Sequence, residues 1–204
     1  MKKTKETQVS DYIRRKDGIA SAVHEILELV GEDPEREGLR RTPDRVARMY
    51  DEILAGYQTD PISMINEALF DVEYDEMIAV KDIDFFSMCE HHMLPFYGRV
   101  HVAYIPKEKV IGLSKIPRVV EMFARRLQVQ ERMTREIADF LDGVLSPQGV
   151  GVVVEGSHLC ARMRGVKKEQ ALMVTSAMLG GFKTDARTRN EFMQLLNRPA
   201  HSLS

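Results

Sequence analysis

The sequence has few cysteines, no long apolar run and almost no net charge, and each shortage excludes a class of protein. Two cysteines in 204 residues cannot form the dense disulfide framework of a small secreted domain. No segment reaches the apolar length that a bilayer requires, so we expect no membrane-spanning helix and no membrane partner. A net charge of −2 argues against a nucleic-acid-binding protein that relies on bulk positive charge.

The N-terminal segment MKKTKETQVS also lacks the apolar run of a signal peptide, because nothing hydrophobic follows its lysines. We therefore expect a cytoplasmic protein. In that compartment a free pair of cysteines favours metal binding over a disulfide. Hydrophobic residues make up 44% of the chain and charged residues 29%, which is typical of a globular protein with one proper core.

The hydrophobic pattern predicts an α+β protein with a helical N-terminal region at 1–74 and a second domain at 75–204. Apolar residues at helical spacing predict helices at 8–30, 42–54, 62–69, 114–126, 129–144 and 184–196. Extended and alternating segments predict strands at 77–86, 99–105, 150–161 and 171–179. This order of elements favours a mainly antiparallel sheet.

Two short runs contain both cysteines and three of the six histidines: Cys89-Glu90-His91-His92 and His158-Leu159-Cys160. Thiolate and imidazole are the ligands that zinc prefers, and a Cys-x2-His spacing lets one turn present two of them on one side. The fold must then bring the second run back to the first. The sequence therefore predicts a zinc site.

The spacing leaves the ligand set open. His91 lies between Cys89 and His92 and cannot share their direction, which leaves it available for proton transfer. His158 and Cys160 are two apart on a predicted strand, point to the same face, and could both be ligands. Three protein ligands plus water are typical of a catalytic site, whereas four make a closed structural one. The plainer alternative is a pair of buried thiols and some surface histidines.

Several long segments closely resemble the GTP cyclohydrolase I family. They are GEDPEREGLRRTPDRVARMY, CEHHMLPFYGRVHVAYIP, GLSKIPRVVEMFARRLQVQERMT and SHLCARMRGV. The resemblance extends from about residue 19 to the last helix. It implies the first step of pterin and folate synthesis, in which GTP is hydrolysed and rearranged to 7,8-dihydroneopterin triphosphate and formate.

The resemblance also implies roles for the two runs. Cys89, His92 and Cys160 would bind Zn²⁺ and leave its fourth position to water, whose pKa zinc lowers to about 7. His158 would be an acid–base residue that protonates N7 of guanine, and His91 would exchange a second proton near the ribose ring oxygen. Histidine suits both roles because its pKa lies near the working pH.

The remaining implied site residues would bind GTP. Cations would hold the triphosphate, because arginine binds phosphate in a fork and a helix N-terminus favours an anion. These cations are Lys115, Arg118 and Arg164, with Arg45 as a further candidate. Ser114 would be a catalytic residue that adds a hydroxyl beside these cations. Glu131, with Gln130 beside it, would accept the two adjacent N–H donors of guanine; without the resemblance, Glu131 reads as a helix-dipole residue.

The implied fold is the tunnelling fold, a four-stranded antiparallel sheet with two helices between the strand pairs, plus N-terminal helices. The resemblance implies a homodecamer with sites between subunits. Two alternatives remain: a tunnelling-fold relative such as a deazaguanine reductase, which uses a cysteine nucleophile, and a structural zinc module. The reductase has no reason to keep the zinc set. The module leaves His91, Lys115, Arg118 and Glu131 without a joint explanation.

Overall fold

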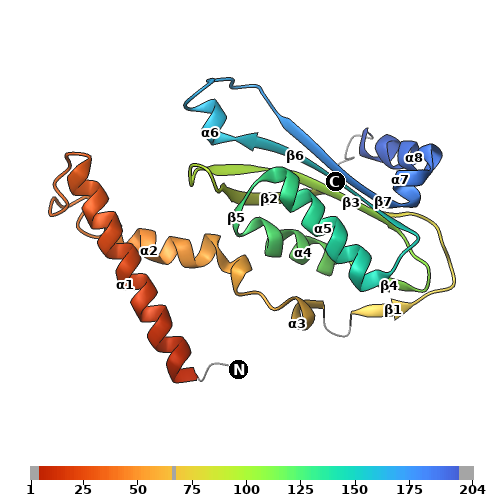
Figure 1. Ribbon diagram of the computed structural model, residues 1–204, viewed down its shortest axis with the longest axis horizontal. Helices are drawn as coiled ribbons and strands as arrows, with labels where there is room; N and C mark the ends of the chain where they lie inside the picture. Colours follow the sequence, from red (N-terminus) through yellow and green to blue (C-terminus); the bar gives the residue numbers. More distant parts are fainter. Residues whose placement is uncertain (1–4, 66–67, 198–204) are drawn as a thin grey trace, which may run out of the picture. The chain divides into compact units, whose positions relative to one another are not determined.

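The computed structural model describes residues 5–65 and 68–197 (Figure 1). Contacts divide the chain into two compact units, Met1–Ala55 and Gly56–Ser204. Within the described residues, no helix has both the length and the apolar character that crossing a membrane requires.

The first unit consists of two helices that pack against each other, α1 (Lys5–Leu29) and α2 (Thr42–Ile53). An ion pair joins them, with 2.6 Å between Arg15 Nη2 and Asp51 Oδ1. Gly31 follows α1 at φ +87°, in the left-handed region where glycine commonly ends a helix. The helix therefore ends where the sequence predicts, but it begins before the predicted start at residue 8.

The second unit is built on a five-stranded sheet, which confirms the predicted α+β class. Its strands, in sheet order, are β5 (Leu127–Gln128), β2 (Ile78–Cys89), β3 (Pro95–Ile105), β6 (Gly149–His158) and β7 (Met173–Gly180). The four long strands pair antiparallel, and the two-residue β5 pairs parallel with β2. The short β5 makes five strands where the sequence predicted four. A separate pair joins β1 (Leu69–Asp71) to β4 (Lys109–Ile111).

Helices cover both faces of the sheet (Figure 1). The longer ones are α4 (Lys115–Ala124), α5 (Gln130–Leu145) and α8 (Ala186–Asn197); the short ones are η1 (Ala55–Tyr57), α3 (Pro61–Ile65), α6 (Leu159–Arg162) and α7 (Gly181–Thr184). The main core lies between α4, α5 and one sheet face, which contributes Val102 and Val152. Their neighbours Ala103 and Val153 point to the other face and pack with α7 and α8.

Strand direction explains why distant segments meet at one end of this sheet. Strands β2 and β6 both run antiparallel to β3, which lies between them, so their C-terminal ends lie at the same edge. Strand β5 runs parallel to β2 and leads directly into α5, so α5 begins at that edge too. Both sequence runs with cysteine and histidine therefore end up side by side (Figure 1).

One predicted strand is too long, and the difference affects the site. The strand predicted at 150–161 ends at His158, and Cys160 lies in the short helix α6. The spacing had suggested that the side chains of His158 and Cys160 share one strand face. The structure contradicts that prediction, because only His158 lies on the strand. The change from strand to helix between them lets the two side chains do different things.

Candidate metal and acid–base site

A tight turn between β2 and β3 presents the first two candidate ligands. Cys89 accepts backbone hydrogen bonds from Met93 at 2.8 Å and from His92 at 3.4 Å, and its own N–H donates to Leu94 at 2.9 Å. Met93 has φ +52°, a left-handed conformation that reverses the chain. The turn thereby holds the side chains of Cys89 and His92 on one side, with 3.9 Å between Cys89 Sγ and His92 Nδ1.

The start of α6 adds the third candidate ligand. One potential ligand atom from each of Cys89, His92 and Cys160 lies within 4.8 Å of the other two. Cys89 is buried, Cys160 is half-buried and His92 is exposed, so the cluster lies at the surface rather than inside the core. Both cysteines are free.

This donor set fits a zinc ion. Zn–S bonds of about 2.3 Å and Zn–N bonds of about 2.0 Å in a tetrahedron space neighbouring ligand atoms about 3.5–3.8 Å apart. The separation of 3.9 Å between Cys89 Sγ and His92 Nδ1 is close to that spacing. Two soft sulfurs and one imidazole also match zinc rather than a hard cation such as Mg²⁺. These three residues could therefore hold a metal ion.

The thiols must lose their protons for that binding. Burial raises the pKa of Cys160, and its contact with the Cys89 thiol raises it further, whereas Arg164 acts to lower it. Two adjacent thiols resist forming two thiolates on their own, and a divalent cation removes that repulsion. Arg164 lowers the pKa of Cys160, as a bound cation would.

The ring of His91 lies about as close to the Cys89 sulfur as the ring of His92 does, which the sequence did not predict. Its Nδ1 lies 4.0 Å from Cys89 Sγ, almost as near as the Nδ1 of His92. Within the part of the chain that the structure describes, however, His91 does not join a group of three candidate ligands. Nearness to Cys160 therefore distinguishes the two histidines. His91 is exposed, so its ring is accessible for proton exchange.

His158 lies at the end of β6 and is not part of the three-residue cluster. Its ring stacks on Phe96, with 4.6 Å between ring centroids and 3° between planes. The two residues are direct partners in the β3–β6 register, which explains the stacking. His158 Nε2 contacts Gln130 Oε1 at 2.9 Å. Burial lowers the pKa of His158, and the charge of Glu131 opposes that change.

Gln130, which was predicted to contact substrate, forms a set of hydrogen bonds within the protein. Its side chain is fully buried, and its amide nitrogen donates to the carbonyls of Val154 and Met173 at 3.0 and 2.9 Å. Since its amide oxygen faces His158, both polar ends are used within the protein. A substrate contact by Gln130 stays a prediction, and the contacts that the structure shows are all within the protein. Sequence reasoning missed this role because the partners are backbone groups 24 and 43 residues away.

Glu131 and Glu90 share this edge of the sheet but have different surroundings. Glu131 lies exposed in the first turn of α5 and interacts electrostatically with His158. Glu90 instead forms a two-pronged ion pair with Arg132, at 2.6 and 2.8 Å. The hydrogen bond from Arg132 lowers the pKa of Glu90. Arg132 thus ties α5 to the ligand turn, and Glu131 is left facing solvent.

The predicted phosphate-binding residues lie on three different segments. Ser114 and Arg118 are exposed at the start of α4, and Arg164 is exposed just after α6. Lys115 is half-buried and donates to the Met64 carbonyl at 2.6 Å, so a phosphate would have to compete for it. Arg45 is exposed on α2 in the other unit. Their roles stay predictions.

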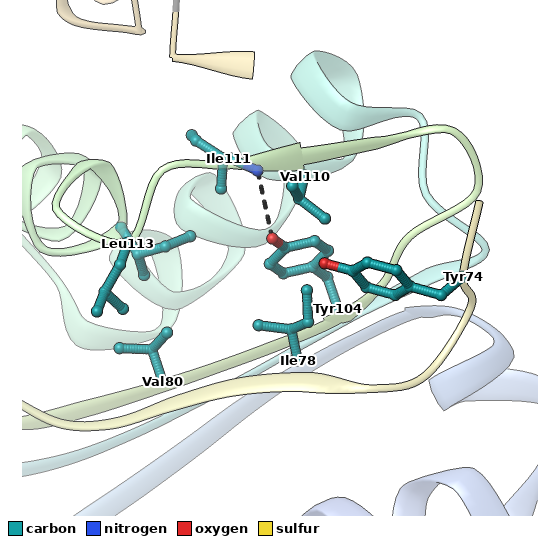
Figure 2. A pocket seen from close by; sticks show the side chains of 8 residues that line it. Tyr74, Ile78, Val80, Tyr104, Val110, Ile111 and Leu113 are labelled. Carbon is teal, nitrogen blue, oxygen red and sulfur yellow. Dashed lines mark hydrogen bonds between the residues drawn. The ribbon is translucent and has the colours of Figure 1, made fainter. Parts of the chain in front are cut away.

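A hollow of about 170 Å³ lies elsewhere in the second unit, near the start of β2 (Figure 2). Most of its lining is aliphatic, and no predicted site residue lines it. Figure 2 shows the hydroxyl of Tyr104 accepting a hydrogen bond from the backbone of Ile111 at 3.3 Å. Its aliphatic lining suits neither a triphosphate nor a metal ion.

The fold and the site together define a class: an α+β protein with a Cys-His-Cys cluster that could hold a metal ion at one sheet edge, beside a histidine and a carboxylate. The chain belongs to the GTP cyclohydrolase I family, whose model matches residues 19–197.

The sequence is similar to those of several named proteins over most of their lengths. GTP cyclohydrolase 1 of Chlorobaculum tepidum is 57% identical over 87% of this chain and 80% of its own. The enzymes of the same name from Leptospira biflexa and Campylobacter lari are 53% and 52% identical and are covered over 98% and 93% of their lengths. The apo crystal structure of the archaeosine synthase QueF-Like has a TM-score of 0.45 and 17% identity, covering 53% of this chain and 98% of that one.

Proposed function

We propose that this protein converts GTP to 7,8-dihydroneopterin triphosphate and formate, with zinc as its metal. The observation that carries the proposal is the convergence of Cys89, His92 and Cys160 within 4.8 Å, in a chain of the GTP cyclohydrolase I family. Zinc held by these residues would lower the pKa of a water molecule that it binds to about 7 and so supply a nucleophile at neutral pH.

The chain's own residues would move the protons. Addition of water across the C8–N7 bond of guanine places a proton on N7, and His158 at the end of β6 supplies it. Ring opening leaves a formamide, whose hydrolysis releases formate. His91, exposed beside the ligand turn, exchanges the proton that opens the ribose ring. The sugar then rearranges and the new ring closes with loss of water, so no oxidant or reductant is consumed.

The substrate's two ends need different partners. We propose that Glu131 accepts the two adjacent N–H donors of guanine, because it is an exposed carboxylate close enough to influence His158, the residue proposed to protonate the base. Arg118, Arg164 and Lys115 would bind the triphosphate. Ser114 would add a hydroxyl, and Arg45 is a further candidate.

We also retain the tunnelling fold, with residues 1–74 as a helical region and 75–204 as the catalytic domain. The four long antiparallel strands and the two helices between strand pairs support that fold. A homodecamer with sites between subunits, and a cytoplasmic location, are part of the same proposal.

Incubation of the metal-loaded protein with GTP tests the proposal directly. We expect one formate for each GTP consumed, together with the absorbance of a dihydropterin. The same protein treated with a chelator is the control, and activity should return when zinc is added back. If GTP is bound but neither formate nor a pterin forms, the proposed activity is wrong.

Replacement of Glu131 by glutamine should weaken the binding of GTP by about 10- to 100-fold, because a charge-assisted hydrogen bond to the base is worth about 1.5–3 kcal/mol. Binding of inorganic triphosphate, which has no base, should be nearly unchanged. Isothermal titration calorimetry on both ligands measures the difference. The matched variant Arg118→Ala should weaken both ligands alike. Equal losses for both ligands in Glu131→Gln would remove its role in base recognition.

A further inference from the structure

The hydrogen bonds of Gln130 fix which of its amide groups faces His158. Carbonyl oxygens only accept hydrogen bonds, and two of them, from Val154 and Met173, lie 3.0 and 2.9 Å from one end of the amide. That end must therefore be the NH2 group. The amide oxygen is left to face His158 Nε2 at 2.9 Å.

An amide oxygen has no hydrogen to donate, so His158 must supply the one in this contact. Nε2 of His158 therefore carries a hydrogen in both the neutral and the charged ring. In the neutral ring the lone pair is then on Nδ1. Within the described residues, Nδ1 of His158 has no hydrogen-bond partner that would fix it otherwise.

Packing allows the amide little freedom to turn over. The Gln130 side chain has no exposed surface. A side-chain carbon on Gly156 would lie 2.1 Å from Gln130 Oε1, so the space that the amide oxygen occupies exists because residue 156 is glycine. The Thr175 hydroxyl also lies 3.1 Å from the amide nitrogen and 2.7 Å from the Thr134 hydroxyl. Strands β6 and β7 and helix α5 itself thus surround one amide.

We propose that Gln130 is a positioning residue that orients the His158 ring and holds it in the Nε2–H tautomer, which leaves the lone pair of the neutral ring on Nδ1. Gln130 touches no substrate in this role. The identity of the substrate rests on the function proposed above, but the tautomer does not. A wrong tautomer would present a hydrogen where the reaction needs a lone pair, or the reverse, as in other enzymes whose histidine is oriented by a neighbour.

Nitrogen NMR on zinc-loaded protein labelled at its six histidines tests the tautomer directly. His158 is assigned as the signal that is missing from a His158→Asn sample, and the pH is set where the ring is neutral. We expect the hydrogen on Nε2, with the Nδ1–H form at least about tenfold rarer, the ratio that about 1.4 kcal/mol of hydrogen bonding produces. A hydrogen on Nδ1 in the unaltered protein overturns the proposal, and this measurement needs no variant of Gln130.

Gln130→Met supplies the functional half of the test, because methionine keeps the volume and removes the amide. We expect the His158 tautomers to become mixed and kcat to fall by about 10- to 100-fold, within the range of general acid–base contributions. KM for GTP and zinc content should hold. Thr175→Val is the matched control, since it removes one contact to the same amide nitrogen and leaves both carbonyls; it should keep the Nε2–H tautomer.

The outcomes separate this proposal from the proposed function. A Gln130→Met protein with an unchanged tautomer and unchanged kcat would refute the positioning role while GTP still yields formate. A protein that shows the Nε2–H tautomer but forms no formate from GTP would keep the role of Gln130 and refute the function.

Discussion

Cys160→Ser should lose metal and turnover together. The substitution replaces a thiolate by a hydroxyl at one of three atoms that lie within 4.8 Å of one another. Loss of a residue that merely supports a metal ligand costs about 10- to 100-fold in metal affinity, so loss of a ligand should cost more than about 100-fold. We expect elemental analysis of the purified variant to fall from one zinc per chain to almost none, and formation of formate from GTP to fall with it.

The control for this experiment is Met163→Ala, which alters an exposed side chain three residues further on and should keep both zinc and activity. Thermal unfolding of both variants reports whether the fold is intact. Full turnover by a Cys160→Ser protein that is shown to be free of metal would refute the proposed centre.

His158→Ala should give the opposite pattern: zinc retained and turnover lost. His158 Nε2 contacts Gln130, and the ring is not part of the three-residue cluster, so its removal leaves every candidate ligand in place. General acid–base catalysis by one residue contributes about 10²- to 10⁴-fold, and kcat should fall by that factor. Elemental analysis and a formate assay on one preparation measure both quantities.

His24→Ala is the matched control, because His24 is exposed on α1 near Glu28 and Glu35 and should affect neither quantity. Should the His158→Ala protein be empty of zinc instead, then His158 is a ligand, as its spacing to Cys160 first allowed, and the division between metal binding and proton transfer is wrong.

Strong local patterns predicted the second unit well. The apolar stripe of Met133, Ile137 and Leu141 indicated α5, and all three side chains are fully buried. The two ligand runs could be paired from chemistry alone, because soft donors at short spacing are rare in a chain with two cysteines.

The sequence failed where a role depends on contacts that are distant in the chain. Nothing in the residues around Cys160 distinguishes the end of a strand from the start of α6, and the predicted strand ran past it. Gln130 looked like a substrate contact because it precedes Glu131. Its burial depends on backbone carbonyls of β6 and β7, which no local pattern reveals.

Because β2 and β6 end at one edge of the sheet, the candidate metal ligands and the exposed segment after α6 can change independently in evolution. The three clustered donors lie where β2 and β6 end. The hydrogen bonds of both strands to β3 therefore fix the distances between these donors. The exposed segment after α6, which carries Arg164, is outside those strands. If Arg164 binds the triphosphate as proposed, insertions or charge changes in this segment should alter which anionic group is bound and leave the spacing of the three donors intact.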